Sequence, residues 1–316
     1  MVLVRAVAGR VLASLGTLLI VGLALFVLTR SGPSSPARIV LGVDATVEQI
    51  RDFERVNGLD RSLLAQYGDW LAQVARGEFG RSFVTGRDVA TEIVNALPVT
   101  LSLVLTAFAI ALVFGVALGT AAALRPGGVV DRLSRFGTVI GLSIPAFWLS
   151  ILMIRVFAVD LRWLPPGGYA PLSAGLGTHL QFVAMPALSL AVYYVAVLAR
   201  MTQASLQETL RSDHVRTARA MGLPRRKVVV YALVNALPPV VNLAALSFGY
   251  MFGWALIIEQ VFNVPGLSRA LLNAISQRDF LLLQGIVFLF TAVFILANLT
   301  ADLVNRLLDP RQRTAA

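Results

Sequence analysis

The sequence contains no cysteine, only two histidines (His179 and His214) and a single lysine, Lys227. Without cysteine the chain has no disulfide, no thiolate nucleophile and no cysteine-ligated metal site, and two histidines supply little for any other metal centre. The lysine follows Arg226 and not a glycine, so no Gly-x-x-x-x-Gly-Lys phosphate-binding loop exists. A His-Glu-x-x-His zinc-protease motif is also absent. We therefore expect this chain to bind no metal, cofactor or nucleotide of its own.

Charged residues are scarce as well. They make up 14% of the 316 residues, whereas hydrophobic residues make up 57%, and the mean hydropathy is +0.76. A soluble domain has about 25% charged residues. The composition predicts an all-α integral membrane protein, and we attribute the net charge of +10 to membrane topology and not to nucleic-acid binding.

Long apolar runs predict six membrane-spanning helices, because about 20 apolar residues are needed to cross the hydrocarbon core. The first run is longer than the core of a secretory signal, so we interpret it as an uncleaved span. Pro98 is expected in the opening turn of the second span, where its missing N–H costs least. The predicted spans are Val11–Thr29, Val99–Ala123, Phe136–Val159, Phe182–Ala199, Ala236–Ile258 and Phe280–Val304.

Between the first two spans, residues 31–97 have a different character, with seven arginines and nine acidic residues. Thr46 to Gln49 resembles a capping box that opens a helix ending near Asn57 and Gly58. Apolar residues after Asp60 then recur at helical spacing as far as Gly77, which predicts an amphipathic helix. We divide the chain into the first span (1–30), a small helical domain (31–97) and a five-helix core (98–316).

The charges fix the expected topology. Six spans place both termini on one side, together with residues 124–135 and 200–235. That side holds 15 Lys and Arg against 5 acidic residues, whereas the other side holds 12 of each. By the positive-inside rule the first side is cytoplasmic, so residues 31–97 face outward.

Polar residues inside the spans are candidates for a solute pathway. They are Asn242, Glu259, Gln284 and Asn298. Hydrogen bonds between helices are the alternative role for the three amides. Glu259, at the end of the fifth span, is expected at the membrane interface.

Three other groups inside the spans have simpler interpretations. Arg155 lies near the outer end of the third span and is expected to reach the interface, although a pathway role is the alternative. Asp302 and Arg306, spaced i and i+4, suit a local ion pair. Intramembrane serine chemistry at Ser189 or Ser247 would need a nearby base, and the two histidines lie on opposite sides of the predicted membrane. We expect no enzyme.

The segment 200–235 is the most informative part of the chain. Ser212 or Asp213 can cap a short helix, and Gly222 is a natural stop with Pro224 beyond it. Small residues in this helix permit close approach by a partner, while the basic cluster Arg225–Lys227 could instead bind anionic lipid heads. Composition alone leaves a protein partner and a lipid surface equally open.

This segment resembles a known family. RTARAMG followed by NALPPVV is similar to the "EAA" loop of bacterial ABC-importer permeases, in particular of those for dipeptides, oligopeptides and nickel. The chain departs from the family pattern at His214, Met221 and Val234. Further resemblances cover nearly the whole chain: GEFGRSFVTGRDV, LPVTLSL, PAFWLSILMI, LPPGGY, EQVFNVPGLSRALLNAI and NLTADLVNRLLDPR.

The resemblance implies a permease subunit with the type I importer fold, in the bacterial inner membrane. Its implied partners are a second permease, two ATPase subunits or domains that carry ATP and Mg, and an extracytoplasmic binding protein that delivers a peptide or related solute. It assigns ATPase coupling to the helix at 212–222 and its neighbour. The residues concerned are Asp213, His214, Arg216, Thr217, Ala218, Arg219, Ala220, Met221, Gly222 and Leu223. The alternative function is a channel or secondary transporter that works alone.

Overall fold

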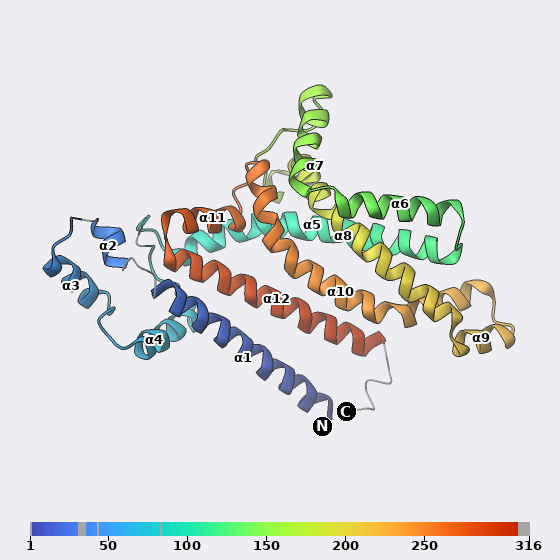
Figure 1. Cartoon of the computed structure of the whole chain (residues 1–316), viewed down its shortest axis with the longest axis horizontal. Coiled ribbons are helices and arrows are strands. Elements are labelled where there is room, and N and C mark those ends of the chain that lie inside the picture. The colour runs from blue at the N-terminus through green and yellow to red at the C-terminus, as the bar shows by residue number, and fades with distance from the viewer. Residues whose placement is uncertain (1, 31–35, 43, 83, 309–316) are drawn as a thin grey trace. The chain divides into compact units, whose positions relative to one another are not determined.

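The computed structural model describes residues 2–30, 36–42, 44–82 and 84–308, and this part of the chain is almost entirely helical (Figure 1). Its one β-type pairing is an isolated bridge between Arg81 and Asp88. The α-helices are α1 (Val2–Arg30), α2 (Pro36–Leu41), α3 (Val47–Val56), α4 (Leu63–Ala75), α5 (Val89–Leu124), α6 (Val129–Ser143), α7 (Ala146–Met153), α8 (Leu176–Arg211), α9 (Asp213–Ala220), α10 (Arg225–Val261), α11 (Leu267–Gln277) and α12 (Phe280–Leu308).

Five of these helices are long and apolar enough to cross a membrane: α1 from Leu12, α5, α8, α10 and α12. A sixth span results if α6 and the segment Ala146–Asp160 are counted together. The predicted class, an all-α protein that spans the membrane several times, is confirmed.

The third predicted span is not continuous, which corrects the prediction of one helix over Phe136–Val159. Helix α6 ends at Ser143, and α7 leaves it at an angle of 99° (Figure 1). A π-helix, η1 (Ile154–Asp160), continues α7. The cause of the break is Pro145, which disfavours helical geometry in the residue before it; Ile144 accordingly has an extended ψ of 121°.

The second span begins earlier than predicted, and Pro98 lies inside α5 instead of in its first turn. The Asp88 side chain accepts a hydrogen bond from the Thr91 N–H at 2.9 Å and caps the helix. The hydrogen bond from the Thr91 hydroxyl, and after it this backbone bond, lowers the pKa of the Asp88 carboxyl. Val89 and Ile93 are buried in a hydrophobic cluster. Burial of this first stretch stabilises the helix enough to tolerate one missing backbone hydrogen bond at the proline.

Helices α8 and α10 extend beyond the predicted spans, to 36 and 37 residues. Both run through internal prolines, Pro186 in α8 and the pair Pro238 and Pro239 in α10. The basic triplet Arg225–Lys227 forms the first turn of α10. The polar ends stay helical because apolar side chains within them pack together, as described below for the functional site.

The chain folds into two compact units. The first contains Val99–Pro265 together with residues 2–7 of α1 and residues 293–308 of α12. Within it α8 is the central helix, since it packs against α6, α7 and α10. The stretch after η1 closes back on the end of α10, where the Gly168 N–H donates to the Phe262 carbonyl at 2.8 Å.

The second unit contains Ala8–Pro98 and Gly266–Ala292. The capping box at Thr46 is present, and α3 ends at Val56 with Gly58 at a φ of +65°, as predicted. The apolar side of the amphipathic helix α4 is a packing face, because Trp70 stacks edge-on against Phe288 at 5.5 Å between ring centroids. The division of the chain at residues 31 and 97 stays a prediction.

Two glycines bring α5 and α8 into close contact within the first unit. Gly115 and Gly119 are four residues apart, the spacing typical of tightly packed membrane helices. A Cβ atom at Gly115 would lie 2.8 Å from the Leu198 Cβ, and one at Gly119 would overlap the Ala199 carbonyl oxygen. Only glycine lets the two backbones approach this closely.

We predict that Gly119→Leu lowers the free energy of unfolding by about 1–3 kcal/mol, the usual cost of overpacking. Thermal unfolding of the detergent-solubilised chain measures the effect. Gly137→Leu is the matched control, because nothing lies within 4 Å of a Cβ at that position of α6. Equal unfolding temperatures for the two variants would contradict the close contact of α5 with α8.

Candidate functional site: the short helix between α8 and α10

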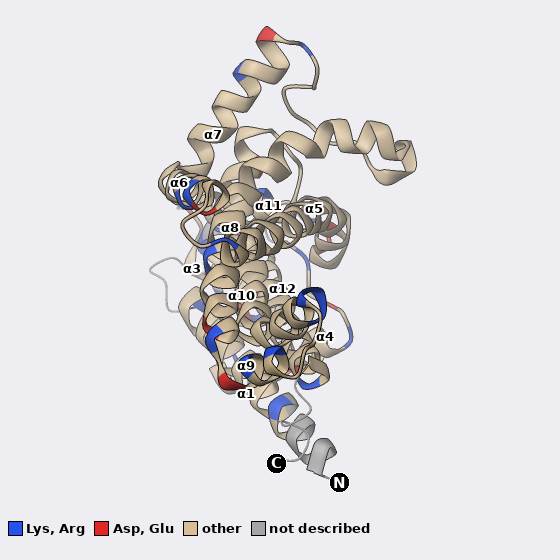
Figure 2. Ribbon diagram, turned by 90° about the vertical axis from the view of Figure 1, so that its right-hand side faces the viewer, with Lys and Arg blue, Asp and Glu red and all other residues tan. Residues whose placement is uncertain are grey.

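Helix α9, Asp213–Ala220, has 8 residues and stands between two helices of more than four times its length. Ser212 alone separates it from α8, and residues 221–224 separate it from α10. In Figure 1 it lies where α8 ends and α10 begins. Figure 2 shows acidic and basic residues beside α9, whereas residues 176–199 of α8 and 228–258 of α10 carry none.

One side chain anchors α9 to the rest of the first unit. Val215 is fully buried and is the only buried residue of the helix. It packs in a cluster with Ala123, Leu206, Val228, Ala232 and Ala236. The Ser205 hydroxyl also donates to the Ala236 carbonyl at 2.8 Å and joins α8 to α10 beside this cluster. Val215 was not among the predicted site residues, although it is the one large apolar residue in a polar eight-residue helix.

α9 begins where the sequence predicts, but the predicted side-chain cap is absent. Ser212 is the N-cap residue, as expected, yet neither it nor Asp213 caps the helix through its side chain, because the Ser212 hydroxyl donates back to the Thr209 carbonyl. His214, which departs from the family pattern, contacts the chain itself. Its ring packs edge-on against Tyr231 of α10 at 5.8 Å.

The end of α9 is a Schellman motif, in which a left-handed glycine reverses the chain. Gly222 has a φ of +75°. Its N–H donates to the Arg219 carbonyl at 3.0 Å, and the Leu223 N–H donates to the Ala218 carbonyl at 3.3 Å. These two bonds satisfy carbonyls that a helix end otherwise leaves open. The predicted stop at Gly222 is confirmed.

Most of the predicted coupling residues form one exposed surface. Ala218 is half-buried, and Met221 is 75% exposed. The Arg216 guanidinium lies 3.5 Å from the Asp213 carboxylate, but both side chains are exposed, so this pair contributes little to stability. The exposed surface consists of Asp213, His214, Arg216, Thr217, Arg219, Ala220, Met221, Gly222 and Leu223.

The four pathway candidates do not form one cluster. Asn242 of α10 accepts a hydrogen bond from Asn305 of α12, and Gln284 of α12 donates to the Thr29 hydroxyl of α1. Both therefore bond between helices, as predicted. Asn298 instead donates to the Phe294 carbonyl of its own helix at 2.8 Å, so the expected interhelical bond there is wrong. A pathway role for these residues stays a prediction.

Glu259 and Arg155 lie in different surroundings. Glu259 is fully buried and accepts a hydrogen bond from the Thr100 hydroxyl at 2.6 Å; its expected position at the membrane interface stays a prediction. This partner is available because α5 packs beside the end of α10. Arg155 is exposed and forms an ion pair with Asp160 at 3.2 Å across the π-helix.

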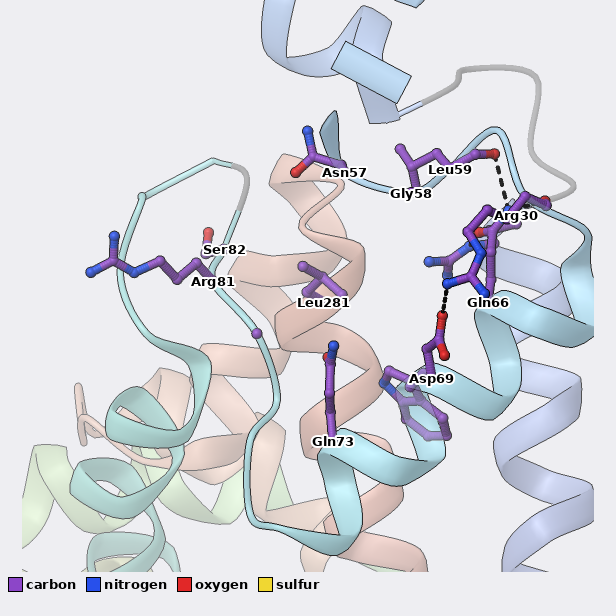
Figure 3. Close-up of a pocket in the computed structure, with 13 residues that line it drawn as sticks. Arg30, Asn57, Gly58, Leu59, Gln66, Asp69, Gln73, Arg81, Ser82 and Leu281 are labelled. Carbon is purple, nitrogen blue, oxygen red and sulfur yellow. Dashed lines mark hydrogen bonds and ion pairs between the residues drawn. The ribbon is translucent and has the colours of Figure 1, made fainter. Parts of the chain in front are cut away.

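The second unit contains a polar pocket of about 480 Å³ (Figure 3). One wall holds Arg30, whose Nε donates to the Gln66 side-chain oxygen at 2.7 Å, and the ion pair between Arg61 and Asp69. Figure 3 shows Arg81, on the opposite wall, directed away from the pocket. Gln66 is nearly buried and donates to two backbone carbonyls, so these groups hold the segment that follows α3 against α4.

The described residues contain no group of three histidine, aspartate or glutamate side chains that could hold a metal ion. The residues around α9 instead form a small exposed surface on a short helix that joins α8 to α10. That surface combines exposed guanidinium groups with small residues, and it is fixed from behind by Val215.

Two family models match the chain. "Binding-protein-dependent transport system inner membrane component" matches residues 115–314, and the corresponding N-terminal model matches residues 3–104. The chain is 35% identical over 305 residues to the "Probable peptide ABC transporter permease protein y4tP" of Sinorhizobium fredii. It is 37% identical over 305 residues to the "Glutathione transport system permease protein GsiC" of Escherichia coli K12. Each alignment covers 96% of this chain and 97% of the relative.

A solved structure shows the same fold. The MetNI methionine ABC transporter in its inward-facing conformation matches with a TM-score of 0.53 and 20% identity, over 69% of this chain and 96% of the matched chain. Together with the family matches, this likeness confirms the importer-permease fold predicted from the sequence. The chain belongs to the binding-protein-dependent transport system inner membrane component family, and it is a transport subunit and not a catalytic one.

Proposed function

We propose that this chain is the membrane-spanning permease subunit of an ATP-driven peptide importer, and that α9 is the helix on which an ATPase docks. The observation that carries the proposal is the fixed exposed surface of α9. An eight-residue helix with one buried side chain has little stability of its own, and Val215 holds it between the ends of α8 and α10. Such a surface suits a partner that pushes on the helix.

The proposed energy source lies on other chains. The sequence has no phosphate-binding loop, so ATP and Mg would be bound by two ATPase subunits or domains. A second permease would complete the pathway, and an extracytoplasmic binding protein would deliver the solute. We place both termini and α9 in the cytoplasm of a bacterium, and residues 31–97 outside the inner membrane, on the charge asymmetry of the sequence.

Motion of α9 would be transmitted through the cluster around Val215. The cluster joins α9 to Leu206 of α8 and Val228 of α10, which lie at the cytoplasmic ends proposed for these helices. A packed core of this kind moves as a body and does not deform continuously. Displacement of α9 by the ATPase would therefore tilt the ends of two long helices together.

The basic triplet Arg225–Lys227 has a separate role in this proposal. All three residues are exposed in the first turn of α10. Positive charge at a helix N-terminus opposes the helix dipole, so an anionic partner would relieve this repulsion. Anionic lipid head groups at the cytoplasmic surface suit that role.

The proposed solute is a peptide or a related small molecule. The support comes from two relatives, whose names describe a peptide permease and a glutathione permease. Selectivity would depend largely on the binding protein, as the resemblance implies. A self-sufficient channel or secondary transporter is the competing function. If the purified chain alone moved solute across a vesicle membrane without an ATPase, that competing function would be correct.

We predict that Ala220→Trp prevents the ATPase from co-purifying with the affinity-tagged chain. We also expect it to reduce ATP-dependent solute uptake at least tenfold. Ala220 is exposed on α9, so an indole there blocks close approach without disturbing the core of this chain. Val129→Trp, on the exposed first residue of α6, is the control. Normal ATPase recovery with Ala220→Trp would contradict docking on this surface.

A second prediction concerns coupling. Gly222→Val forces a β-branched residue into the left-handed region, at a cost of about 1–2 kcal/mol, and should loosen the end of α9. We expect ATP hydrolysis to continue while the solute transported per ATP falls several-fold. Gly177→Val, in the first turn of α8 with no neighbour within 4 Å, is the control. Transport and hydrolysis rates equal to those of the unmodified complex would count against this role of Gly222.

A further inference from the structure

Helix α4 packs against the apolar parts of two membrane spans within the second unit, α1 and α12 (Figure 1). The Tyr67 hydroxyl of α4 donates to the Leu19 carbonyl of α1 at 2.7 Å. A Cβ atom at Gly22 of α1 would lie 3.3 Å from the Trp70 ring, and the centroid of that ring is 5.5 Å from the centroid of Phe288 in α12. These contacts fix the position of α4 along both spans.

The depth of α4 follows from where its contacts lie in the two spans. The apolar run of α1 ends at Arg30, and that of α12 begins after Asp279. Gly22 is 8 residues before Arg30, and Phe288 is 9 residues after Asp279. At 1.5 Å per residue, each contact is about 12–14 Å along its helix from the charged end. Half of the hydrocarbon core is about 15 Å thick, so two separate helices place Trp70 inside the membrane.

The exposed residues of α4 fall into two groups on different sides of the helix. Asp69 and Gln73 are polar, and both line the pocket of Figure 3, where Asp69 pairs with Arg61. The other exposed residues are apolar. After Leu63 they recur every three or four positions, which places them on one side of the helix. This apolar face of α4 consists of Leu64, Gly68, Ala72 and Ala75.

The depth of α4 determines what covers its apolar face. At the same level α1 exposes apolar side chains of its own, Ile20 at 70% and Leu23 at 40%. The one charge on α4 is paired and lies on the pocket side, and the Tyr67 hydroxyl has a backbone acceptor. Polar groups in or beside hydrocarbon need such partners. A helix that is apolar on one side and polar on the other suits a position in the membrane boundary, with the apolar side toward the acyl chains.

We propose that α4 is embedded in one leaflet of the membrane, with its apolar face against lipid acyl chains. The partner of this surface is thus lipid, whereas the sequence predicted a helix in a domain outside the bilayer. Residues 31–97 still begin and end on one side of the membrane, because α4 does not cross it. The proposal depends on α1 and α12 as membrane spans and does not depend on peptide import. Under the proposed topology the leaflet is the outer one.

Spin labels on single cysteines test the proposal in the complete transporter, reconstituted in phospholipid vesicles, because the sequence has no cysteine of its own. Oxygen concentrates in hydrocarbon, whereas a polar nickel complex stays in water. We expect the ratio of oxygen to nickel collision rates at Leu64→Cys to be at least about fivefold higher than at Val56→Cys. Val56, at the end of the charged helix α3, is the water control because it is 80% exposed, as is Leu64. Ile20→Cys is the lipid reference and should resemble Leu64→Cys.

Two results would overturn the proposal. A ratio at Leu64→Cys equal to that at Val56→Cys would show that the apolar face of α4 meets water. Low collision rates with both reagents would show that protein, such as the second permease, covers this face. If Leu64→Cys prevents assembly of the transporter, Ala72→Cys on the same face gives the same measurement with the same expected result.

The side of the membrane is tested separately. In intact cells, a membrane-impermeant maleimide should label Val56→Cys if residues 31–97 face outward. Labelling only after the cells are broken would contradict the proposed topology. The collision rates at Leu64→Cys would still decide whether α4 lies in lipid, so the topology and the position of α4 fail in distinguishable ways.

Discussion

The constraint on which this structure depends is the lack of water in the bilayer, which obliges each backbone N–H and C=O group to find a partner within the protein. Long helices meet it directly, as in α8 and α10 with 36 and 37 residues. The informative places are those where a helix stops. At Gly222, which the proposed topology places in the cytoplasm, a Schellman motif satisfies the carbonyls of α9 even though water is available there. At Pro145 no side-chain cap does so, and there the structure has a pocket.

These two interruptions occur in the same unit and share one scaffold. Helix α8 contributes Leu206 to the cluster that holds α9, and it contributes Tyr194 to the pocket at the break. α10 does the same with Val228 and Trp254. Since both helices run unbroken between the two places, a displacement imposed on α9 would reach the walls of the pocket.

Sequence reasoning succeeded where the signals are local. The capping box at Thr46 and the glycine stop at Gly222 were both predictable because each depends on neighbouring residues. It failed where tertiary packing decides. Pro145 ends a helix, whereas Pro98 and Pro186 lie inside helices. No pattern within the apolar runs distinguishes the proline that ends a helix from the two that do not. The residues of the pocket were missed for this reason, because a continuous third span leaves no site for them.

The central claim is that the exposed surface of α9 meets an ATPase. Met221→Cys would be the only cysteine in this chain, and Met221 is 75% exposed beside the end of α9. A short photoreactive crosslinker attached there should link the chain to the ATPase subunit in the assembled transporter, with a yield that changes when ATP is added. Crosslinks to lipid or to the second permease alone, with none to the ATPase, would contradict the account.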